Sequence, residues 1–224
     1  MTKINLSKRL LAISSMVQKN STTIDVGCDH ALLDIYLSQN KIAKKLIASD
    51  VTEGALKQAK KNISLSGVKN VETRLADGLD ALKESDNVDT IIISGLGNQK
   101  IINILKKDVY KLKNVKNIII QSNTGYDMVR KEVNKLGYFI EDETLVKEND
   151  IIYIIIKFTK GNKKYSNRQL YFGPVLLKNK NELFKEIVNN EINKNTYIIN
   201  NLPRRKIIKK FCLMLKVRKL KKEI

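Results

Sequence analysis

Apolar and polar positions follow two alternating rhythms from residue 22 to about residue 160. Short runs such as TIIIS and NIIIQ are almost wholly apolar, as expected for strands that a parallel sheet buries on both faces. Between these runs, apolar residues recur every three or four positions, which is the spacing of an amphipathic helix. Such alternation is typical of an α/β, doubly wound sheet. The pattern predicts strands at 22–27, 46–50, 70–75, 88–94 and 115–121, and helices at 31–39, 53–66, 99–107 and 126–136.

The rhythm changes after the fifth strand. Two strand-like runs, 138–147 and 151–159, are separated by the tripeptide END, which is too short for a crossover helix and therefore predicts antiparallel pairing. Five parallel strands followed by an antiparallel hairpin resemble the seven-stranded sheet of class I methyltransferases, which use S-adenosylmethionine (SAM). A dinucleotide-binding fold would instead continue with further strand–helix units.

Helices are expected at both ends of the chain. Leu6, Leu10, Ile13 and Val17 recur at helical steps, which favours an amphipathic helix over a signal peptide. After the Gly-Pro breaker at 173–174, two groups of apolar residues at helical spacing predict an antiparallel helical hairpin, or small coiled coil. We therefore expect a Rossmann-like domain at 1–160 and a helical-hairpin domain at 161–224. The two apolar groups are Leu183, Phe184, Ile187, Val188 and Ile192, and then Ile208, Phe211 and Leu215.

Charge adds a partner to this picture. Lysine and arginine outnumber acidic residues by 42 to 23, and a formal charge of +19 attracts polyanions, RNA above all. A chain rich in Lys, Asn and Ile could also simply reflect an A/T-biased genome. The last 24 residues hold ten basic side chains and a single acidic one, which predicts contact with RNA phosphates, a solvated helix face being the alternative. The predicted RNA-binding residues in this segment are Arg204, Arg205, Lys206, Lys209 and Lys210.

Composition also argues against several classes of protein. Cys28 and Cys212 lie far apart and lack metal-ligand spacing, so neither a disulfide framework nor a metal site is predicted. No apolar run approaches the roughly 18 residues that a membrane span requires. The expectation is a soluble, cytoplasmic protein that acts as a monomer.

The end of the first strand, DVGCDHA, carries the first candidate site. The carboxyl ends of parallel strands are where α/β folds bind nucleotide-like ligands, and Gly27 lets the backbone approach such a ligand closely. Asp29 stands where a dinucleotide motif has its second glycine. Its carboxylate would repel a pyrophosphate but attract the ammonium and sulfonium groups of SAM. The alternative is that Asp29 only caps the following helix.

Acidic residues also end the next two strands. Asp50 follows Gly27 by 23 positions, close to the spacing at which a carboxylate accepts ribose hydroxyls, unless it is merely a solvated strand end. Asp77 could accept from an adenine amino group, and the adjacent Gly78 would permit close approach. Three acidic strand ends in succession are more specific than any one alone.

The fourth and fifth strands end in ISGLGNQK and IIIQSNTG. Gly95 and Gly97 permit unusual backbone angles, so this loop could present its peptide groups to a substrate. Asn98 could hydrogen-bond the edge of a target base or cap the next helix. Gln121 and Asn123 reach the same edge of the sheet, although Asn123 could equally form a turn.

Seven segments together resemble the bacterial tRNA adenine-N1 methyltransferases that act on adenine 22 in the D-arm region. They are NLSKRLLAISSMV, DVGCDHALLDIYL, ASDVTEGALKQAKKNI, RLADGLDAL, ISGLGNQKIINIL, IIIQSN and YFGPVLL, in that order, and span about residues 5–190. The resemblance implies SAM as cofactor, S-adenosylhomocysteine as product and tRNA as partner. The glycine loop departs from the family's GMGG, because Leu96 replaces methionine and Asn98 replaces the last glycine.

The resemblance also implies roles for individual residues. Arg9, in LSKRL, would bind the cofactor carboxylate or an RNA phosphate. The N1 lone pair of adenine needs no general base, so Asp29, Asn98 and Asn123 are candidate catalytic acceptors near the exocyclic amino group of the target base. His30 is expected to position the cofactor or the backbone, a proton shuttle being the alternative. The implied cofactor-binding residues are Gly27, Cys28, Asp29, His30, Asp50, Val51, Asp77, Gly78 and Gly95.

Three other functions stay open from the residues alone. The first is a SAM-dependent enzyme that acts on a different RNA, a protein or a small molecule, and the basic C-terminal segment weighs against the last two. A non-catalytic RNA-binding module on the same sheet is the second, disfavoured by the three acidic strand ends. An NAD-dependent reductase is the third, disfavoured by Asp29 and by the terminal hairpin.

Overall fold

The computed structural model of this protein describes residues 4–203 and 205–224. These residues form two compact units, the first ending at Gly173 and the second beginning at Pro174. The segment 161–173, which was expected to belong with the C-terminal helices, folds with the first unit. A functional boundary at residue 160 stays a prediction.

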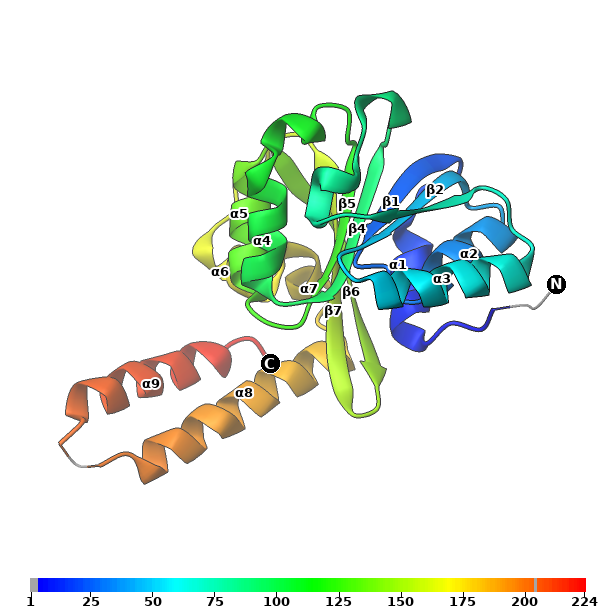
Figure 1. Ribbon diagram of the computed structural model, residues 1–224. Helices are drawn as coiled ribbons and strands as arrows, with labels where there is room; N and C mark the ends of the chain where they lie inside the picture. Colours follow the sequence, from blue (N-terminus) through cyan, green and yellow to red (C-terminus); the bar gives the residue numbers. More distant parts are fainter. Residues whose placement is uncertain (1–3, 204) are drawn as a thin grey trace. The chain divides into compact units, whose positions relative to one another are not determined.

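A seven-stranded sheet, counted over the described residues, forms the centre of the first unit (Figure 1). Its strand order is β3-β2-β1-β4-β5-β7-β6. The first five strands pair in parallel, whereas β7 runs antiparallel to both β5 and β6. The predicted methyltransferase-like sheet is thus confirmed. The strands are β1 (Ser21–Val26), β2 (Ala43–Asp50), β3 (Val71–Leu75), β4 (Thr90–Leu96), β5 (Asn117–Ser122), β6 (Tyr138–Glu148) and β7 (Ile151–Lys160).

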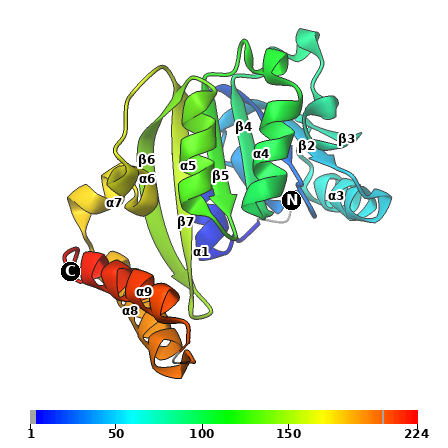
Figure 2. The ribbon, with the colours of Figure 1, turned by 90° about the vertical axis from the view of Figure 1, so that its left-hand side faces the viewer.

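Helices cover both faces of this sheet. In Figure 1, α1, α2 and α3 lie on one side of the sheet and α4 and α5 on the other, and Figure 2 views α4 and α5 in front of β4 and β5. The isoleucines at 91–93 and 118–120 are therefore fully buried, which explains why these strands are apolar without alternation. The helices of this unit are α1 (Lys8–Met16), α2 (Leu32–Gln39), α3 (Glu53–Ser66), α4 (Asn98–Lys107), α5 (Tyr126–Lys135) and α6 (Asn167–Phe172), with 3₁₀ turns η1 (Gly78–Ala81), η2 (Glu84–Asp86) and η3 (Val109–Leu112).

The N-terminal helix α1 is fastened to the sheet by its apolar face. Ile13, Met16 and Val17 pack into the same buried cluster as Leu33 and Leu37 of α2, as the spacing predicted. The hydroxyl of Ser7 accepts from the N–H of Leu10 at 3.4 Å and so caps the start of the helix. Arg9 of α1 reaches the carboxyl edge of the sheet, where its Nη1 donates to Gln121 Oε1 of β5 at 2.8 Å.

A buried ion pair holds the end of the first unit. Arg130 of α5 and Glu143 of β6 are both fully buried, and Arg130 Nε donates to Glu143 Oε1 at 2.7 Å. Arg130 Nη1 also donates to the carbonyl oxygens of Leu170 and Tyr171 in α6, at 3.1 and 3.0 Å. A Cβ on Gly173 would lie 2.5 Å from the Glu143 carboxylate, so the glycine of the YFGP segment is required by this contact.

We predict that Gly173→Ala destabilises the protein far more than Gly137→Ala. Both glycines have positive φ, +93° and +84°, but a Cβ at Gly137 would meet no atom within 4 Å. The strain of a left-handed residue costs about 1–2 kcal/mol, and displacing a buried ion pair should bring the loss at Gly173 to about 3 kcal/mol or more. Urea unfolding measures both losses; equal losses would contradict the proposed role of the contact.

The second unit is a pair of antiparallel helices, α8 (Glu182–Asn201) and α9 (Ile207–Leu220), preceded by α7 (Pro174–Asn179). Phe184, Val188 and Ile192 of α8 are buried, as the spacing predicted. Lys216 of α9 pairs with Glu191 of α8 at 2.7 Å, which ties the two helices together. Across the described residues, no helix has the length and apolarity that crossing a bilayer would demand.

The apolar series in α9 corrects an expectation. Ile208, Phe211 and Leu215 lie at helical spacing, but their exposed fractions are 82%, 59% and 42%, so they do not form the seam of the hairpin. Leu220, which is 1% exposed, marks the buried face instead. The periodicity locates a helix face correctly without telling which partner, if any, covers it.

Candidate active site at the carboxyl edge of the sheet

The register of the parallel strands brings four strand ends to one edge. Val26 of β1 lies opposite both Ser49 of β2 and Ile93 of β4, and Ser94 lies opposite Gln121 of β5. The strand order reverses at β1, whose neighbours on either side follow it in the chain. In open α/β sheets such a reversal opens a crevice at the carboxyl edge, which is where ligands bind.

A cavity of about 290 Å³ lies in this crevice. The segment after β1 and the end of β4 form its walls, and α1 and α2 contribute the remainder. It brings together six residues that the sequence singled out: Arg9, Gly27, Cys28, Asp29, His30 and Gly95. Asp25, Leu10, Leu32, Leu33, Ser94 and Leu96 complete the lining.

The segment between β1 and α2 holds a strained backbone. Gly27, Asp29 and Ala31 all have positive φ, of +81°, +51° and +55°. Only glycine adopts this conformation freely, and non-glycine residues that do so concentrate at functional sites. Two hydrogen bonds hold the turn, because the N–H groups of Gly27 and Cys28 both donate to the carbonyl of Ser49, at 2.8 and 2.9 Å. Asp29 therefore does not act as a conventional N-cap; Ala31 precedes α2 without a side-chain cap.

Asp50 adjoins this turn from the end of β2. Its Oδ2 accepts from the N–H of Asp29 at 3.3 Å, while Oδ1 accepts from the N–H and hydroxyl of Thr52, both at 2.9 Å. A carboxylate offers about four acceptor positions, so the Oδ2 atom keeps capacity for a ligand hydroxyl. Neither Asp50 nor Val51, which is 49% exposed, belongs to the lining of the cavity, and Asp50 reaches it only through its contact with Asp29.

Asp77 and Gly78 line a different cavity. They follow β3, whose Leu75 lies opposite Asp50, so the three acidic strand ends do share one edge. The cavity at Asp77, of about 570 Å³, is however bounded by α4 through Gln99, Asn103 and Lys107 among others. The structure thus brings Asp29 and Asp50 together through a hydrogen bond, and places Asp77 beside a separate hollow.

Gln121, at the end of β5, connects the loop after β4 to α1. Its side chain is fully buried, and its Oε1 accepts from Arg9 Nη1 at 2.8 Å and from the N–H of Gly95 at 3.0 Å. Its Nε2 donates to Asn123 Oδ1 at 3.1 Å, and Asn123 Nδ2 donates to the carbonyl of Gly95 at 2.7 Å. Arg9 also lies over the ring of Tyr153, 5.5 Å from its centre. The side-chain amide of Gln121 therefore holds Arg9 of α1 and Gly95 of the β4 end, both of which line the cavity.

Asn98 takes part in a neighbouring contact. It begins α4, where Gly97 is the N-cap, so it does not cap the helix as one reading of the sequence had it. Thr124 Oγ1 donates to Asn98 Oδ1 at 3.0 Å, and Asn98 Nδ2 reaches Met128 Sδ at 3.4 Å. A Cβ on Gly125 would clash with this amide, which explains the glycine there. Asn98 thus joins the loop after β4 to the start of α5.

His30 and Asp29 lie side by side at the mouth of the cavity. His30 Nε2 is 3.5 Å from Asp29 Oδ1, and the two side chains are 49% and 75% exposed. The carbonyl of His30 accepts from Asn62 Nδ2 of α3 at 3.0 Å, which anchors the histidine backbone. Both side chains are therefore free enough of neighbouring atoms to contact a ligand, while the backbone of His30 is fixed by Asn62.

Two buried carboxyl groups were not predicted from the sequence. Asp25 of β1 is 4% exposed and lines the cavity, and Asp34 of α2 is fully buried. Burial raises the pKa of Asp25 to about 7 against the lowering effect of Arg9, and burial together with the charge of Asp25 raises the pKa of Asp34 well above its usual range. The signal was present in TTIDVG and ALLDIYL, where each aspartate interrupts apolar neighbours.

Cys28 is buried and chemically quiet. Burial, reinforced by the charges of Asp25, Asp34 and Asp50, raises the pKa of its thiol far above the ordinary range. Because only a thiolate is a strong nucleophile, Cys28 contributes shape to the cavity and not covalent chemistry. Among the described residues, no group of His, Cys, Asp or Glu side chains has the arrangement of a metal site.

Four predicted RNA-binding residues of the second unit that the structure describes are exposed. Arg205 and Lys206 lie before α9, and Lys209 and Lys210 lie in its first turn. Arg204 lies outside the described residues. Arg9, the sixth candidate, instead points into the cavity and is bound to Gln121. This favours the cofactor role of Arg9 over contact with an RNA phosphate.

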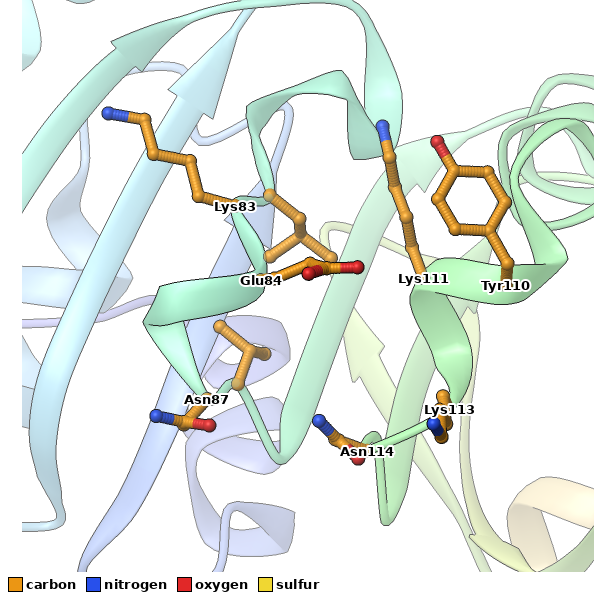
Figure 3. A pocket seen from close by; sticks show the side chains of 9 residues that line it. Lys83, Glu84, Asn87, Tyr110, Lys111, Lys113 and Asn114 are labelled. Atoms are coloured by element: carbon orange, nitrogen blue, oxygen red, sulfur yellow. The ribbon is translucent and has the colours of Figure 1, made fainter.

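A third cavity, of about 580 Å³, lies at the opposite edge of the sheet (Figure 3). It is formed by η2 and η3, ahead of β4 and β5, and Tyr110 and Lys111 project from one side while Lys83 and Glu84 lie on the other. Lys111 Nζ is already paired with Asp80 and Asp108, each at 3.2 Å. None of the predicted site residues borders this cavity.

The cavity at the carboxyl edge fits SAM in its chemistry. Asp25 carries a buried Oδ1 that meets no hydrogen-bond partner among the described residues, and Asp29 is largely exposed beside it, so acceptors are available for a cationic ligand. At Gly27 a Cβ would meet nothing within 4 Å, which leaves open space beside the backbone. Arg9 would suit a carboxylate, and Asp50, which is bound to the N–H of Asp29 beside the cavity, would suit a ribose hydroxyl.

The sheet order and the site at its carboxyl edge define a Rossmann-like, SAM-dependent methyltransferase. A sequence model of the tRNA (adenine(22)-N(1))-methyltransferase family (TrmK) matches residues 23–222. The chain belongs to this family, which confirms the resemblance drawn from the sequence.

Individual relatives agree with this assignment. The tRNA (adenine(22)-N(1))-methyltransferase of Bacillus subtilis is 29% identical over 191 residues, covering 82% of this chain and 80% of the relative. The structure of M. capricolum TrmK in complex with S-adenosyl-homocysteine superposes with a TM-score of 0.87 at 33% identity, covering 97% and 96% of the two chains. The structure of a Streptococcus agalactiae protein of the NADB-Rossmann superfamily superposes with a TM-score of 0.94 at 36% identity, covering 99% of this chain and 98% of the other. The expected cofactor, SAM, is supported by the product bound in the second of these.

We predict that Asp50→Asn weakens SAM binding by about tenfold or more. The substitution turns an acceptor into a donor facing the N–H of Asp29 or the Thr52 donors, and hydrogen bonds to charged groups are worth about 1.5–3 kcal/mol. Asp150→Asn, in the β6–β7 turn, is the matched control. Calorimetry with SAM measures the effect, and equal affinities for the two variants would show that Asp50 does not support the cofactor.

Proposed function

We propose that this protein transfers the methyl group of SAM to N1 of adenine 22 in tRNA. The observation that carries the proposal is the cavity at the carboxyl edge, whose lining joins Arg9, Gly27, Asp29 and Gly95 in a chain that belongs to the TrmK family. Bound SAM supplies an electrophilic methyl group attached to a positively charged sulfur. We further infer that the protein acts as a monomer in the cytoplasm, where its tRNA substrate is found.

The residues of the chain would serve chiefly to align the reactants. The N1 lone pair of adenine lies in the plane of the ring and needs no base to expose it, so alignment accounts for most of the acceleration. Asp29 is the candidate acceptor that lines the cavity. Its carboxylate would accept a hydrogen bond from the exocyclic amino group of adenine as positive charge develops on the ring. The adenine must leave its stacked position to reach this edge.

Asn98 and Asn123 would position the loop after β4. Asn123 holds the carbonyl of Gly95, and Asn98 holds Thr124, so together they join the ends of β4 and β5. Gln121 fixes the N–H of Gly95 and the guanidinium of Arg9 in the same network. We assign these amides to the geometry of the cavity, with His30 as a contact at its mouth.

The second unit would bind the tRNA backbone. Arg205, Lys206, Lys209 and Lys210 are exposed on and before α9, and such a cluster attracts phosphates. Phe211, 59% exposed among these lysines, offers a surface on which an unpaired base can stack. Phosphate contacts position an RNA without reading its sequence, so the hairpin would select tRNA by shape.

Mapping the methylated base tests the proposal directly. Purified protein is incubated with transcribed tRNA and SAM, and reverse transcription then stops at N1-methyladenine. We expect one stop at the D-arm adenine and none in a tRNA in which that adenine is replaced by guanine. Methylation of bulk protein or of a small molecule, without a stop in tRNA, would favour the competing enzyme class.

We predict that Lys209→Glu/Lys210→Glu weakens tRNA binding at least about tenfold at moderate salt and leaves SAM affinity unchanged, because two phosphate-binding charges are reversed. Lys60→Glu/Lys61→Glu on α3 is the control, since it reverses an adjacent, exposed lysine pair on a helix of the first unit. Filter binding across a salt series measures both variants. The assignment of RNA binding to α9 fails if the two pairs weaken tRNA binding equally.

A further inference from the structure

Asp25, which lines the candidate cofactor cavity, and Asp34 of α2 form a pair of buried acids, since the charge of Asp25 acts on Asp34. Within the described residues, Asp25 Oδ1 and both carboxyl oxygens of Asp34 are buried without a hydrogen-bond partner. Asp25 is 4% exposed and borders the cavity, whereas Asp34, in the first turn of α2, is wholly enclosed. An ionised carboxylate that lacks both water and donors is costly, and two neighbouring ones are costlier still.

The surroundings of this pair supply little positive charge. Arg9 of α1 is the cation that lowers the pKa of Asp25, and its Nη1 is already engaged by Gln121. The charge of Asp50 at the end of β2 raises the pKa of Asp25. On β4, the register partner of Asp25 is the apolar Ile92. The loop after β1 adds Cys28, which stays a neutral thiol, and the exposed pair of Asp29 and His30.

These contacts imply that the free protein holds a proton on the pair near neutral pH. Burial raises the pKa of Asp25 to about 7 and that of Asp34 well above its ordinary range. A cation entering the cavity would supply the charge that the pair lacks. The carboxylate could then ionise without remaining uncompensated, and its proton would pass to solvent.

We propose that Asp25 and Asp34 hold a proton in the free protein that is released when the sulfonium charge of SAM enters the cavity. The α-ammonium is common to both ligands, so this exchange lets the pocket distinguish the sulfonium of SAM from the neutral thioether of S-adenosylhomocysteine. The inference rests on the proposed function only in taking SAM as the ligand. When the methyl group leaves, the sulfur keeps the bonding electron pair and loses its positive charge. The acidic pair then takes a proton back from solvent, and the product is held less tightly than the substrate.

The sign of the pH dependence follows from this exchange. If SAM displaces a proton, its affinity rises with pH as the free pair begins to ionise, over about pH 6 to 8, and then levels off. Because the sulfur of S-adenosylhomocysteine is neutral, this ligand displaces fewer protons, and its affinity changes less with pH. The affinity ratio of the two ligands should therefore increase severalfold across that interval.

Calorimetry on the full chain tests the proposal. SAM and S-adenosylhomocysteine are each titrated near pH 7 in phosphate and in Tris, whose different ionisation enthalpies report the number of protons released. We expect more proton release with SAM than with S-adenosylhomocysteine. Equal release by the two ligands, together with an affinity ratio that is constant from about pH 6 to 8, overturns the proposal.

Two variants locate the proton. Asp25→Asn is nearly isosteric and removes the ionisable carboxyl group that borders the cavity, so the difference between the ligands should vanish. Asp150→Asn, in the β6–β7 turn, should keep that difference. Persistence of the difference in Asp25→Asn, or its loss in Asp150→Asn, overturns the assignment. If Asp25→Asn does not fold, Asp25→Ser replaces it with the same expected loss of proton release.

A second measurement needs no ligand. A buried acid whose pKa is raised by folding destabilises the folded state above its unfolded pKa, and the loss grows until pH passes the folded value. Asp34→Asn should therefore raise the melting temperature of the free protein more at about pH 8 than at about pH 5. A rise independent of pH would count against a proton held on the pair. Base mapping in tRNA is independent of both measurements, so a failed methylation test with intact proton release would sink the proposed function alone.

Discussion

The parallel pairing of β1 with β2 on one side and β4 on the other is the constraint on which the site depends. Parallel strands end at the same edge, and the chain must leave β1 and β4 in opposite directions along the sheet. The crevice between the ends of β1 and β4 therefore stays open, because the segments that follow these strands run away from it on either side. Every residue that lines the cavity, except those from α1 and α2, lies in β1, β4 or the turns that follow them.

Within that crevice, a few polar groups set the positions of the loops. The buried amide of Gln121 binds α1 through Arg9 and the β4 loop through Gly95, so elements far apart in the chain meet at one side chain. The Ser49 carbonyl plays the corresponding part for the turn after β1. Fixed loops of this kind suit a reaction whose acceleration comes from alignment, because the protein need not reorganise during the transfer.

The sequence revealed the architecture better than it revealed the site. Isoleucine runs at 91–93 and 118–120 can only be satisfied by burial on both faces, so the parallel sheet was predictable. The acidic strand ends were predictable as neighbours at one edge, but whether Asp77 shares a cavity with Asp29 depends on the path of the chain through η1 and α4. Asp25 and Asp34 escaped notice because a charge inside an apolar run can equally face water. In α9 the apolar face was found, but its exposure depends on tertiary packing that periodicity does not encode.

The contacts of Arg130 bear on how the protein can be divided. A fragment ending at residue 160 would lack the carbonyl oxygens of Leu170 and Tyr171 that accept from Arg130, and water would reach the pair of Arg130 and Glu143. Such a fragment would be expected to be less stable, because breaking the contacts of a buried ion pair is costly. The first compact unit therefore extends through Gly173, and the tyrosine-phenylalanine-glycine tripeptide belongs to the architecture of that unit and not to a linker.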